Sequence, residues 1–524
     1  MLQIMARKRK KPKYKELSFD TAVRNPERYK DFMIFMKDYD GIVLNDENLL
    51  DIVTKMYISG LVTTKNFSIF NYDTMEAKRK AVARVNASRK ADGGYPAGYQ
   101  SRFWTYMRTP SEFGFVYAIY NEKFIFGDVA KKLVDGKIDP QEAFSLQSIK
   151  YNRRSPYRNV SNDYNYFVFI INVLKKLESL NKKMTYNQFI VSLFSKDGNV
   201  EEFIKIINNN KFKDLDSTYN FIIKTYGKKN SYKTVMKDYP DVVLRMLRIT
   251  GFVNLDYKGI LLIELNKNNL KYIDRLLTIC YKLDESEKDV AMNYFNRIGK
   301  IKDTEFSIIL SNREETDEII NYNDTLHKIV NEYKLNESLI IKNIERLCNN
   351  SRTDERFKYI PDPLKFEFFI SLLMYISYGD RYNIKPNYKI DANGIPISHA
   401  PGNIGDIEIT NDEIYWLLEV TLIRNKTQQM NNETVNLFRH INRDISGEKY
   451  LSLIAPYIHQ DTETIYNSTT IQLLSEGMSK FYAKPYSIDN FIKVVKEKNH
   501  FNDMQEYTNH IKKKIIELAS SIVD

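Results

Sequence analysis

A near-continuous run of apolar residues with one acid inside it constrains the fold of this chain more than any other stretch. The run is EIYWLLEVTLI, residues 413–423, and the acid within it is Glu419. It predicts a central β-strand that is buried on both faces, because strands with one solvated face alternate apolar and polar residues. A buried carboxylate is costly unless something compensates its charge. The sequence therefore predicts a divalent cation beside this strand.

A second acid, Asp406, begins the segment DIEI that precedes this run. The two segments predict an antiparallel hairpin that turns at Asn411 and Asp412, so the open ends that carry Asp406 and Glu419 should come close together. Two adjacent carboxylates repel, and Mg²⁺ removes the repulsion because it takes oxygen ligands. A bound cation also activates water and stabilises charge on a phosphate, which favours a metal-dependent nuclease. Asp406 taken alone is explained more simply as a loop cap.

The segments on both sides predict the rest of a mixed α/β core. Residues 365–379 are typical of an apolar helix that carries Glu367, and residues 387–391 and 395–399 predict two strands about an Asn-Gly turn. Residues 449–458 predict another strand, and residues 469–475 one more.

Residues 427–444 predict a helix with Glu433 and His440 on one face, because they are 7 positions apart. Their Cα atoms would lie about 10 Å apart, so one metal is not expected to bind both side chains. One of them would then orient a ligand or a water while the other touches a phosphate. A solvated helix face is the alternative explanation for the pair.

In order and spacing, these residues resemble the AlwI family of type IIS restriction endonucleases, which also contains PleI, MlyI and natural nicking enzymes. The residues that carry the resemblance are His399-Ala-x-Gly-Asn-x-x-Asp406-Ile-Glu, Glu419-Val-Thr421, Thr427-Gln428, Glu433 and Arg439-His440, with Glu367 upstream. The specific match spans about 80 residues, and a looser similarity in the order of elements extends toward the N-terminus.

The resemblance implies a C-terminal nuclease domain of the PD-(D/E)XK type that uses Mg²⁺, with Mn²⁺ as a substitute. By position, the catalytic residues would be Asp406 and Glu419, supported by Glu367, Glu433 and His440. The metal ligands would be Asp406, Glu419 and Val420. Such sites usually carry a lysine where this chain has Thr421, and the family shares that departure. Arg424, Lys426, Gln428 and His440 remain open as replacements for the lysine.

The resemblance also implies a mostly helical N-terminal half that recognises DNA through winged-helix-like subdomains. Two segments, residues 101–136 and 241–265, show the helix–strand–turn–strand order of such a subdomain. A small α+β subdomain without DNA contact is the alternative for each. Residues 75–92 predict a strongly basic helix. The expected DNA-binding residues are Arg84, Arg89, Lys90, Arg102, Arg108, Arg245 and Arg248.

These patterns predict an α/β and α+β chain of several domains. The predicted parts are residues 1–140 and 141–267 for DNA recognition, 268–350 as a helical connector and 351–524 as the nuclease domain, with the main boundary near 345–360. The net charge of +11 raises the odds of a polyanionic partner, with nucleic acid ahead of acidic lipid. Cys280 and Cys348 have no motif spacing and predict reduced thiols in a cytoplasmic protein.

The expected function is cleavage of double-stranded DNA a few base pairs to one side of a short asymmetric site. One alternative is a strand-specific nicking enzyme or one subunit of a heterodimeric enzyme, because one site cuts one strand. A transient homodimer or a second subunit would then complete the cut. Another alternative is a winged-helix DNA-binding protein without catalysis. A cognate DNA methyltransferase is expected as the genetic partner.

Overall fold

The chain forms two compact units, residues 1–316 and residues 317–524. The computed structural model describes residues 13–63, 69, 72, 74–87, 98–227, 231–257, 259–279, 281–316, 321–400, 404–424, 429, 447–478 and 480–523. Each unit is described by itself below. The finer division into four parts stays a prediction.

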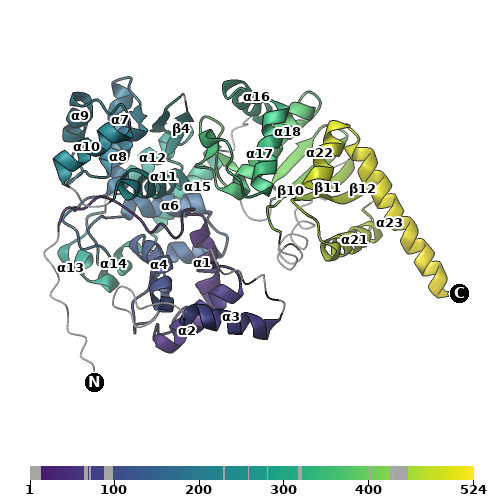
Figure 1. Ribbon diagram of the computed structural model, residues 1–524, viewed down its shortest axis with the longest axis horizontal. Coiled ribbons are helices and arrows are strands. Elements are labelled where there is room, and N and C mark those ends of the chain that lie inside the picture. The colour runs from purple at the N-terminus through teal and green to yellow at the C-terminus, as the bar shows by residue number, and fades with distance from the viewer. Residues whose placement is uncertain are drawn as a thin grey trace. The chain divides into compact units, whose positions relative to one another are not determined.

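The first unit, drawn from purple to teal in Figure 1, is mainly helical. Its α-helices are α1 (Arg28–Met36), α2 (Asp46–Ile58), α3 (Met75–Ala87), α4 (Gly98–Glu112), α5 (Asp128–Val134), α6 (Pro140–Lys150), α7 (Tyr166–Ser179), α8 (Tyr186–Ser192), α9 (Val200–Asn209), α10 (Leu215–Tyr226), α11 (Tyr239–Ile249), α12 (Leu270–Leu277), α13 (Glu285–Asp289), α14 (Ala291–Ile298) and α15 (Asp303–Thr316). Many begin at side-chain caps. Thr185 and Gln188, for example, form the capping box expected from their spacing at the start of α8.

Both helix–strand–turn–strand segments that the sequence predicts are present in the first unit. In one, α4 leads to an antiparallel pair of β1 (Val116–Tyr117) and β2 (Ile125–Phe126), with Asn121 at φ 61° in the turn. In the other, α11 leads to β4 (Val253–Tyr257) and β5 (Leu261–Leu265). A further strand, β3 (Met184–Thr185), adds to β5 to give the order β3-β5-β4. The role of these segments as DNA-binding wings stays a prediction.

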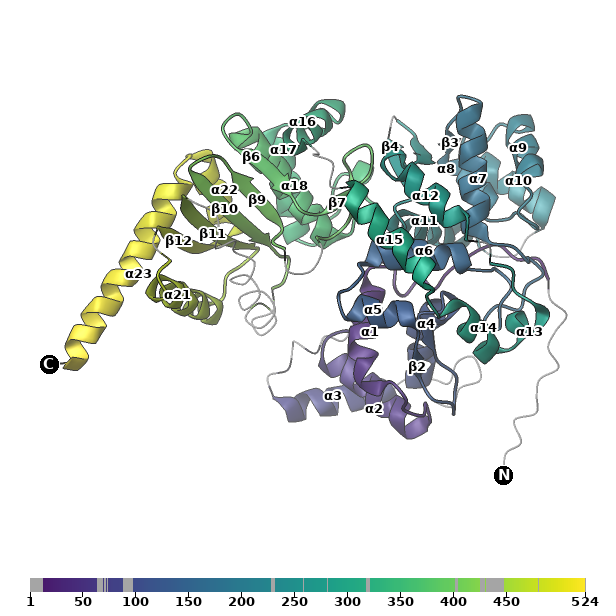
Figure 2. The same ribbon diagram turned by 180° about the vertical axis from the view of Figure 1, so that it is seen from behind.

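The second unit, drawn from green to yellow, contains a five-stranded sheet among its described residues (Figure 2). The sheet has the order β12-β11-β10-β9-β6. Its strands are β6 (Asn383–Pro386), β9 (Ile407–Thr410), β10 (Ile414–Val420), β11 (Glu448–Ala455) and β12 (Phe481–Ser487). β10 lies in the middle, antiparallel to β9 and parallel to β11. The predicted central strand is therefore confirmed.

Helices cover both faces of this sheet. α21 (Gln460–Ser475) packs on the face of Tyr415 and Leu417, where its Tyr466 joins their apolar cluster. The opposite face presents Trp416 to α22 (Ile488–Lys496) and α23 (His500–Val523), with the Trp416 and His500 rings 4.6 Å apart. Figure 2 shows α21 and α22 on opposite sides of the strands. The remaining elements are α16 (Tyr322–Glu332), α17 (Glu337–Cys348), α18 (Asp362–Tyr378), β7 (Lys389–Ile390) and β8 (Pro396–Ser398).

The structure corrects one expectation about this unit. Residues 469–475 were expected to form a strand but are the last turns of α21, where Thr470 and Leu473 face the core. The edge strands β6 and β12 were not predicted. The helix predicted over residues 427–444 lies almost wholly outside the described residues. No described helix is long and apolar enough to cross a bilayer.

Candidate active site

The β9–β10 hairpin brings Asp406 and Glu419 to the same end of the sheet. The register pairs Leu418 with Ile407, so Glu419 and Asp406 are the next residues after the last pair, at the same end of the hairpin. The Val420 N–H donates a hydrogen bond of 2.8 Å to Asp406 Oδ2, which fixes one oxygen of this carboxylate against the end of β10.

Gly405 lets the loop before β9 approach Glu419 closely. A Cβ atom on Gly405 would lie 2.3 Å from Leu417 Cδ1 and 3.1 Å from Glu419 Oε1. Contacts under 3 Å to a buried side chain force a shift, so only glycine allows the observed approach. The missing side chain at position 405 thus keeps the Glu419 carboxylate next to the residue that precedes Asp406.

Asn387, which follows β6, holds the same loop from the other side. Its main-chain N–H donates to the Asp406 carbonyl at 2.9 Å, and its Nδ2 donates to the Gly405 carbonyl at 2.7 Å. Asn387 was not predicted from the sequence as a site residue. An asparagine after a short strand is a common turn residue, so nothing in a single sequence marks it as a positioning residue.

Glu419 itself is only 7% exposed, as expected for an acid in a central strand. Tyr466 of α21 lies close enough for electrostatic coupling. Burial raises the pKa of Tyr466 well above its usual value, and the charges of Tyr507 and Glu419 add to that rise. α21 therefore covers this acid on one side with neutral phenol and apolar groups, which makes the carboxylate depend on a partner of opposite charge.

Thr421, which stands where a lysine is usual in such sites, has a main-chain role. Its N–H donates to the Ile454 carbonyl at 2.9 Å, and its Oγ1 accepts from the Ile423 N–H at 3.1 Å. The residue is 7% exposed. Thr421 thus closes the end of β10 and supplies no cation. Arg424, three residues further on, is exposed.

Glu367 and His399 form a second pair in this unit. Glu367 is 3% exposed on α18, and His399 Nε2 lies 3.4 Å from Glu367 Oε1. Burial raises the pKa of Tyr388, and the Glu367 charge adds to that rise. Tyr388 directly follows Asn387, which is hydrogen-bonded to the loop that carries Asp406. Tyr388 therefore connects Glu367 with that loop.

Several predicted site residues lie outside the described part of the chain: Arg89, Lys90, Lys426, Thr427, Gln428, Glu433, Arg439 and His440. Within the described part, no cluster of three or more His, Cys, Asp and Glu residues is arranged to hold a metal. The described donors are therefore the pair Asp406 and Glu419, with Val420 held to Asp406 through its N–H. Two opposed carboxylates fit a hard cation such as Mg²⁺, which usually keeps several waters and needs few protein ligands.

The predicted DNA-binding arginines differ in accessibility. Arg84 on α3 and Arg108 on α4 are exposed, and Arg108 lies 3.5 Å from Asp20. Arg102 is half-buried. Arg245 pairs with Asp241 at 3.2 Å within α11, and Arg248 is only 3% exposed on the same helix.

Comparison with known protein families identifies the family of this chain. The model of the AlwI restriction endonuclease family matches residues 111–494, well over half of the chain. The chain belongs to the AlwI restriction endonuclease family. It is therefore a nuclease, and the family resemblance expected from the sequence is confirmed. The family match includes Glu367, Asp406 and Glu419.

No curated protein sequence matches this AlwI-family chain. Among solved structures, it is similar to R.BspD6I2, the small subunit of the heterodimeric restriction endonuclease R.BspD6I, with 19% identity over 33% of this chain and 86% of that one and a TM-score of 0.25. It is also similar to the BpuJ1 endonuclease binding domain, solved with modified DNA, with 13% identity over 52% and 90% and a TM-score of 0.33. Restriction endonuclease FokI matches with 10% identity over 92% and 96% and a TM-score of 0.23. The assignment rests on the family match and not on these distant likenesses.

Proposed function

We propose that this AlwI-family restriction endonuclease acts as a type IIS-like enzyme that hydrolyses DNA with a divalent metal held by Asp406 and Glu419. The observation that supports the proposal is the β9–β10 hairpin, which brings the residues Asp406 and Glu419 to the same end of the sheet. Val420 would lie beside the metal, and Mg²⁺, or Mn²⁺ in its place, fits this oxygen-rich pair. We assign the unit that holds this pair to the PD-(D/E)XK type of nuclease.

A divalent cation at this position would supply a nucleophilic water and stabilise the charge that develops on the phosphate. Asp406 would be held in a fixed orientation by the Val420 N–H, because one of its oxygens is already bonded to β10. The burial of Glu419 would exclude bulk water from its carboxylate and so strengthen its interaction with a positive charge. Glu367 with His399, and Glu433 with His440, would support the pair. None of these roles needs a lysine at position 421.

Binding of double-stranded DNA would fall to the first unit, which contains the two predicted winged-helix-like segments. Of the predicted contacts, Arg84 and Arg108 are favoured because they are exposed. Arg102, Arg245, Arg89 and Lys90 stay candidates, whereas the burial of Arg248 favours a role in packing α11. An enzyme that cuts a short site also cuts host DNA unless that site is protected, so we expect a methyltransferase as genetic partner and a cytoplasmic location.

The test is incubation of the purified chain with supercoiled plasmid of known sequence and Mg²⁺. We expect discrete linear fragments, whose sequenced ends give the recognition site and the cleavage offset. Open-circle product without linear DNA would instead support the alternative of a nicking enzyme or one subunit of a two-chain enzyme. Plasmid that stays supercoiled at all enzyme concentrations would contradict the proposal.

A further inference from the structure

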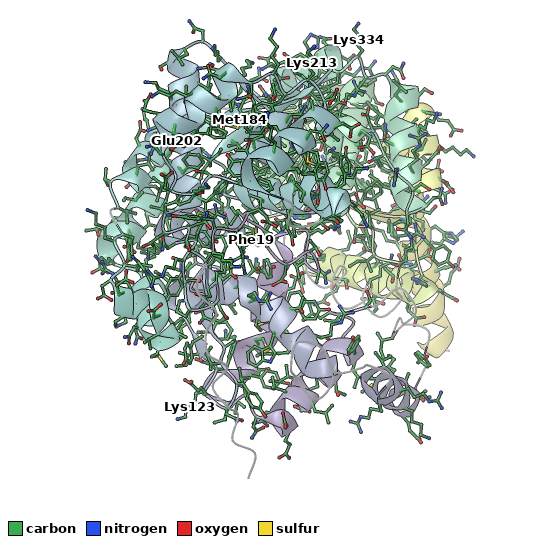
Figure 3. The ribbon with its side chains drawn as sticks, turned by 60° about the vertical axis from the view of Figure 1, so that its left-hand side comes forward. Phe19, Lys123, Met184, Glu202, Lys213 and Lys334 are labelled. Carbon is green, nitrogen blue, oxygen red and sulfur yellow. The ribbon has the colours of Figure 1, made fainter. Side chains whose placement is uncertain are left out.

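A large cavity lies wholly within the first unit and contains none of the nuclease residues. Its volume is about 1220 Å³, above the range of about 300–1,000 Å³ that is usual for small-molecule sites. Residues 13–16 and 18–21, the end of α4 and residues 157–160 line it, together with Lys196 and Tyr239. Phe19, labelled in Figure 3, is one of its buried lining residues. We refer to this cavity as the recognition cleft.

The rim of the recognition cleft carries lysines on a fixed backbone. The Ser161 N–H donates to the Lys13 carbonyl at 3.1 Å, and the Leu17 N–H donates to the Leu193 carbonyl at 2.9 Å. Lys13 and Lys15 are exposed on this tethered segment. Lys196 is also exposed, with its Nζ 5.8 Å from the centre of the Tyr14 ring. These three ammonium groups can therefore reach a ligand without any rearrangement of the main chain.

The floor of the recognition cleft carries acids and arginines together. Arg158 Nε donates to Glu112 Oε2 at 2.7 Å, and Arg108 lies 3.5 Å from Asp20 Oδ1. Glu112 is fully buried, and burial raises its pKa while the Arg158 charge counteracts that rise. Glu112 Oε1 and Asp20 Oδ2 are buried without a hydrogen-bond partner among the described residues. The floor thus offers both hydrogen-bond donors and hydrogen-bond acceptors, and the charges of its two arginines and its two carboxylates cancel.

This layout of charge fits a nucleic acid duplex better than a small anion. A free phosphate would need cations on the floor, where two carboxylates would repel it. A duplex presents phosphates at its outside, which match the lysine rim. Its base edges carry amino donors and carbonyl acceptors, which match carboxylates and arginines on the floor. Residues 7–11, RKRKK, precede this rim in the sequence and add five positive charges to the same end of the chain.

We propose that the recognition cleft binds double-stranded DNA, with Lys13, Lys15 and Lys196 on phosphates and with Asp20 and Arg108 facing base edges. The inference rests on the proposed function and names the surface that reads the substrate. Apart from Arg108, none of these residues was expected from the sequence to contact DNA.

The test compares two double variants by fluorescence anisotropy with a labelled 30-base-pair duplex in EDTA over a series of salt concentrations. K13A/K196A removes two charges from the rim. K123A/K213A removes two exposed charges that lie away from Phe19 in Figure 3 and outside the cleft. We expect K13A/K196A to bind at least tenfold more weakly, with the slope of log K against log salt reduced by about 2. K123A/K213A should bind like the wild type.

A third variant, R108A, tests the floor. It should lower the preference for the cleaved site over an unrelated duplex by about tenfold or more, because a base contact and not a phosphate contact is lost. Thermal unfolding of all variants serves as the folding control.

Unchanged affinity and salt slope in K13A/K196A, or an equal loss in K123A/K213A, would overturn the inference. So would stronger binding of single-stranded RNA of the same length than of duplex DNA. If the wild type cuts plasmid while K13A/K196A keeps full affinity, the inference fails and the proposed function stands. If K13A/K196A loses affinity but the wild type never cuts plasmid, the proposed function fails, and the inference that the recognition cleft binds DNA holds.

Discussion

Glu419 keeps a carboxylate in the central strand of a sheet, where only a compensating charge makes its burial tolerable. Its neighbours are arranged around this requirement. Gly405 gives it space, Asp406 lies at the same end of the hairpin, and Asn387 holds the loop that carries Gly405 and Asp406. The chemistry that we propose at this end of the sheet would therefore depend on positions with no reactive side chain as well as on the two acids.

Substitution of Gly405 by alanine tests this packing. The new methyl group would collide with Leu417 and crowd Glu419, so we expect a loss of about 1–3 kcal/mol in unfolding free energy. Cleavage should fall by more than this stability loss explains, because the acid pair would be displaced. Urea unfolding and plasmid cleavage under conditions where the variant stays folded measure the two effects. A G405A enzyme with wild-type cleavage would show that the close approach is irrelevant.

Thr421 provides a contrasting case at the same scale. Valine at this position removes the hydroxyl that accepts from the Ile423 N–H, at a cost of about 1 kcal/mol in unfolding free energy. We expect T421V to keep cleavage within about twofold of the wild type, because the hydroxyl has a main-chain partner and no chemical role. A tenfold loss of cleavage without a loss of stability would assign Thr421 to the reaction instead.

At the scale of elements, the interior of the second unit was predictable from the sequence and its edges were not. β10 and β11 are near-continuous apolar runs, and the Asn-Gly turn before β8 has Gly394 at φ 80°, so periodicity and turn chemistry were enough. The missed strands β6 and β12 both contain a proline, Pro386 and Pro485, and both lie at the edge of the sheet. Proline lacks an N–H and is tolerated only where one side of the strand has no neighbour. Local pattern does not reveal which strand is the edge.

In the candidate site, too, local relations were predictable from the sequence and long-range relations were not. Asp406 and Glu419 were identified because a hairpin brings the ends of its strands together, which is a local relation. Asn387 and Gly405 were not, because their importance arises from the pairing of β6 with β9 and from the packing of Leu417. Residues 469–475 were wrongly predicted as a strand because a short, partly apolar segment does not distinguish a strand from a buried helix end.

Packing between α23 and the sheet makes stability depend on pH. His500 is buried against Trp416, its Nδ1 lies 2.9 Å from the Tyr378 hydroxyl, and burial lowers its pKa from 6.5 to about 4. Because the unfolded chain takes up this proton at higher pH than the folded chain, stability is full above pH 6.5 and falls as the pH drops toward 4. The expected loss is about 3 kcal/mol.

Urea unfolding of wild type and H500F at pH 7 and pH 4 isolates this contribution. Phenylalanine keeps the apolar contact but has no proton to bind, so the difference between the two pH values should shrink by about 3 kcal/mol in the variant. An identical pH dependence in both proteins would assign the effect to other groups.

At the scale of the whole molecule, our proposals assign recognition and hydrolysis to residues of different compact units. The recognition cleft lies in residues 1–316, and the acid pair lies in residues 317–524. Substitutions at one should therefore leave the other activity intact. The net charge of +11 is consistent with a polyanionic substrate, and binding should weaken steeply with salt.

The measurement that tests the central claim most directly is plasmid cleavage with Mg²⁺ by E419Q, with E413Q as the matched control. Glu413 precedes the same strand at its far end, about 20 Å from Glu419, and is exposed. We predict that E413Q cuts like the wild type, whereas E419Q binds the duplex with unchanged affinity and cuts at least about 100-fold more slowly, because the acid that holds the metal is lost. Wild-type cleavage by E419Q would contradict the account.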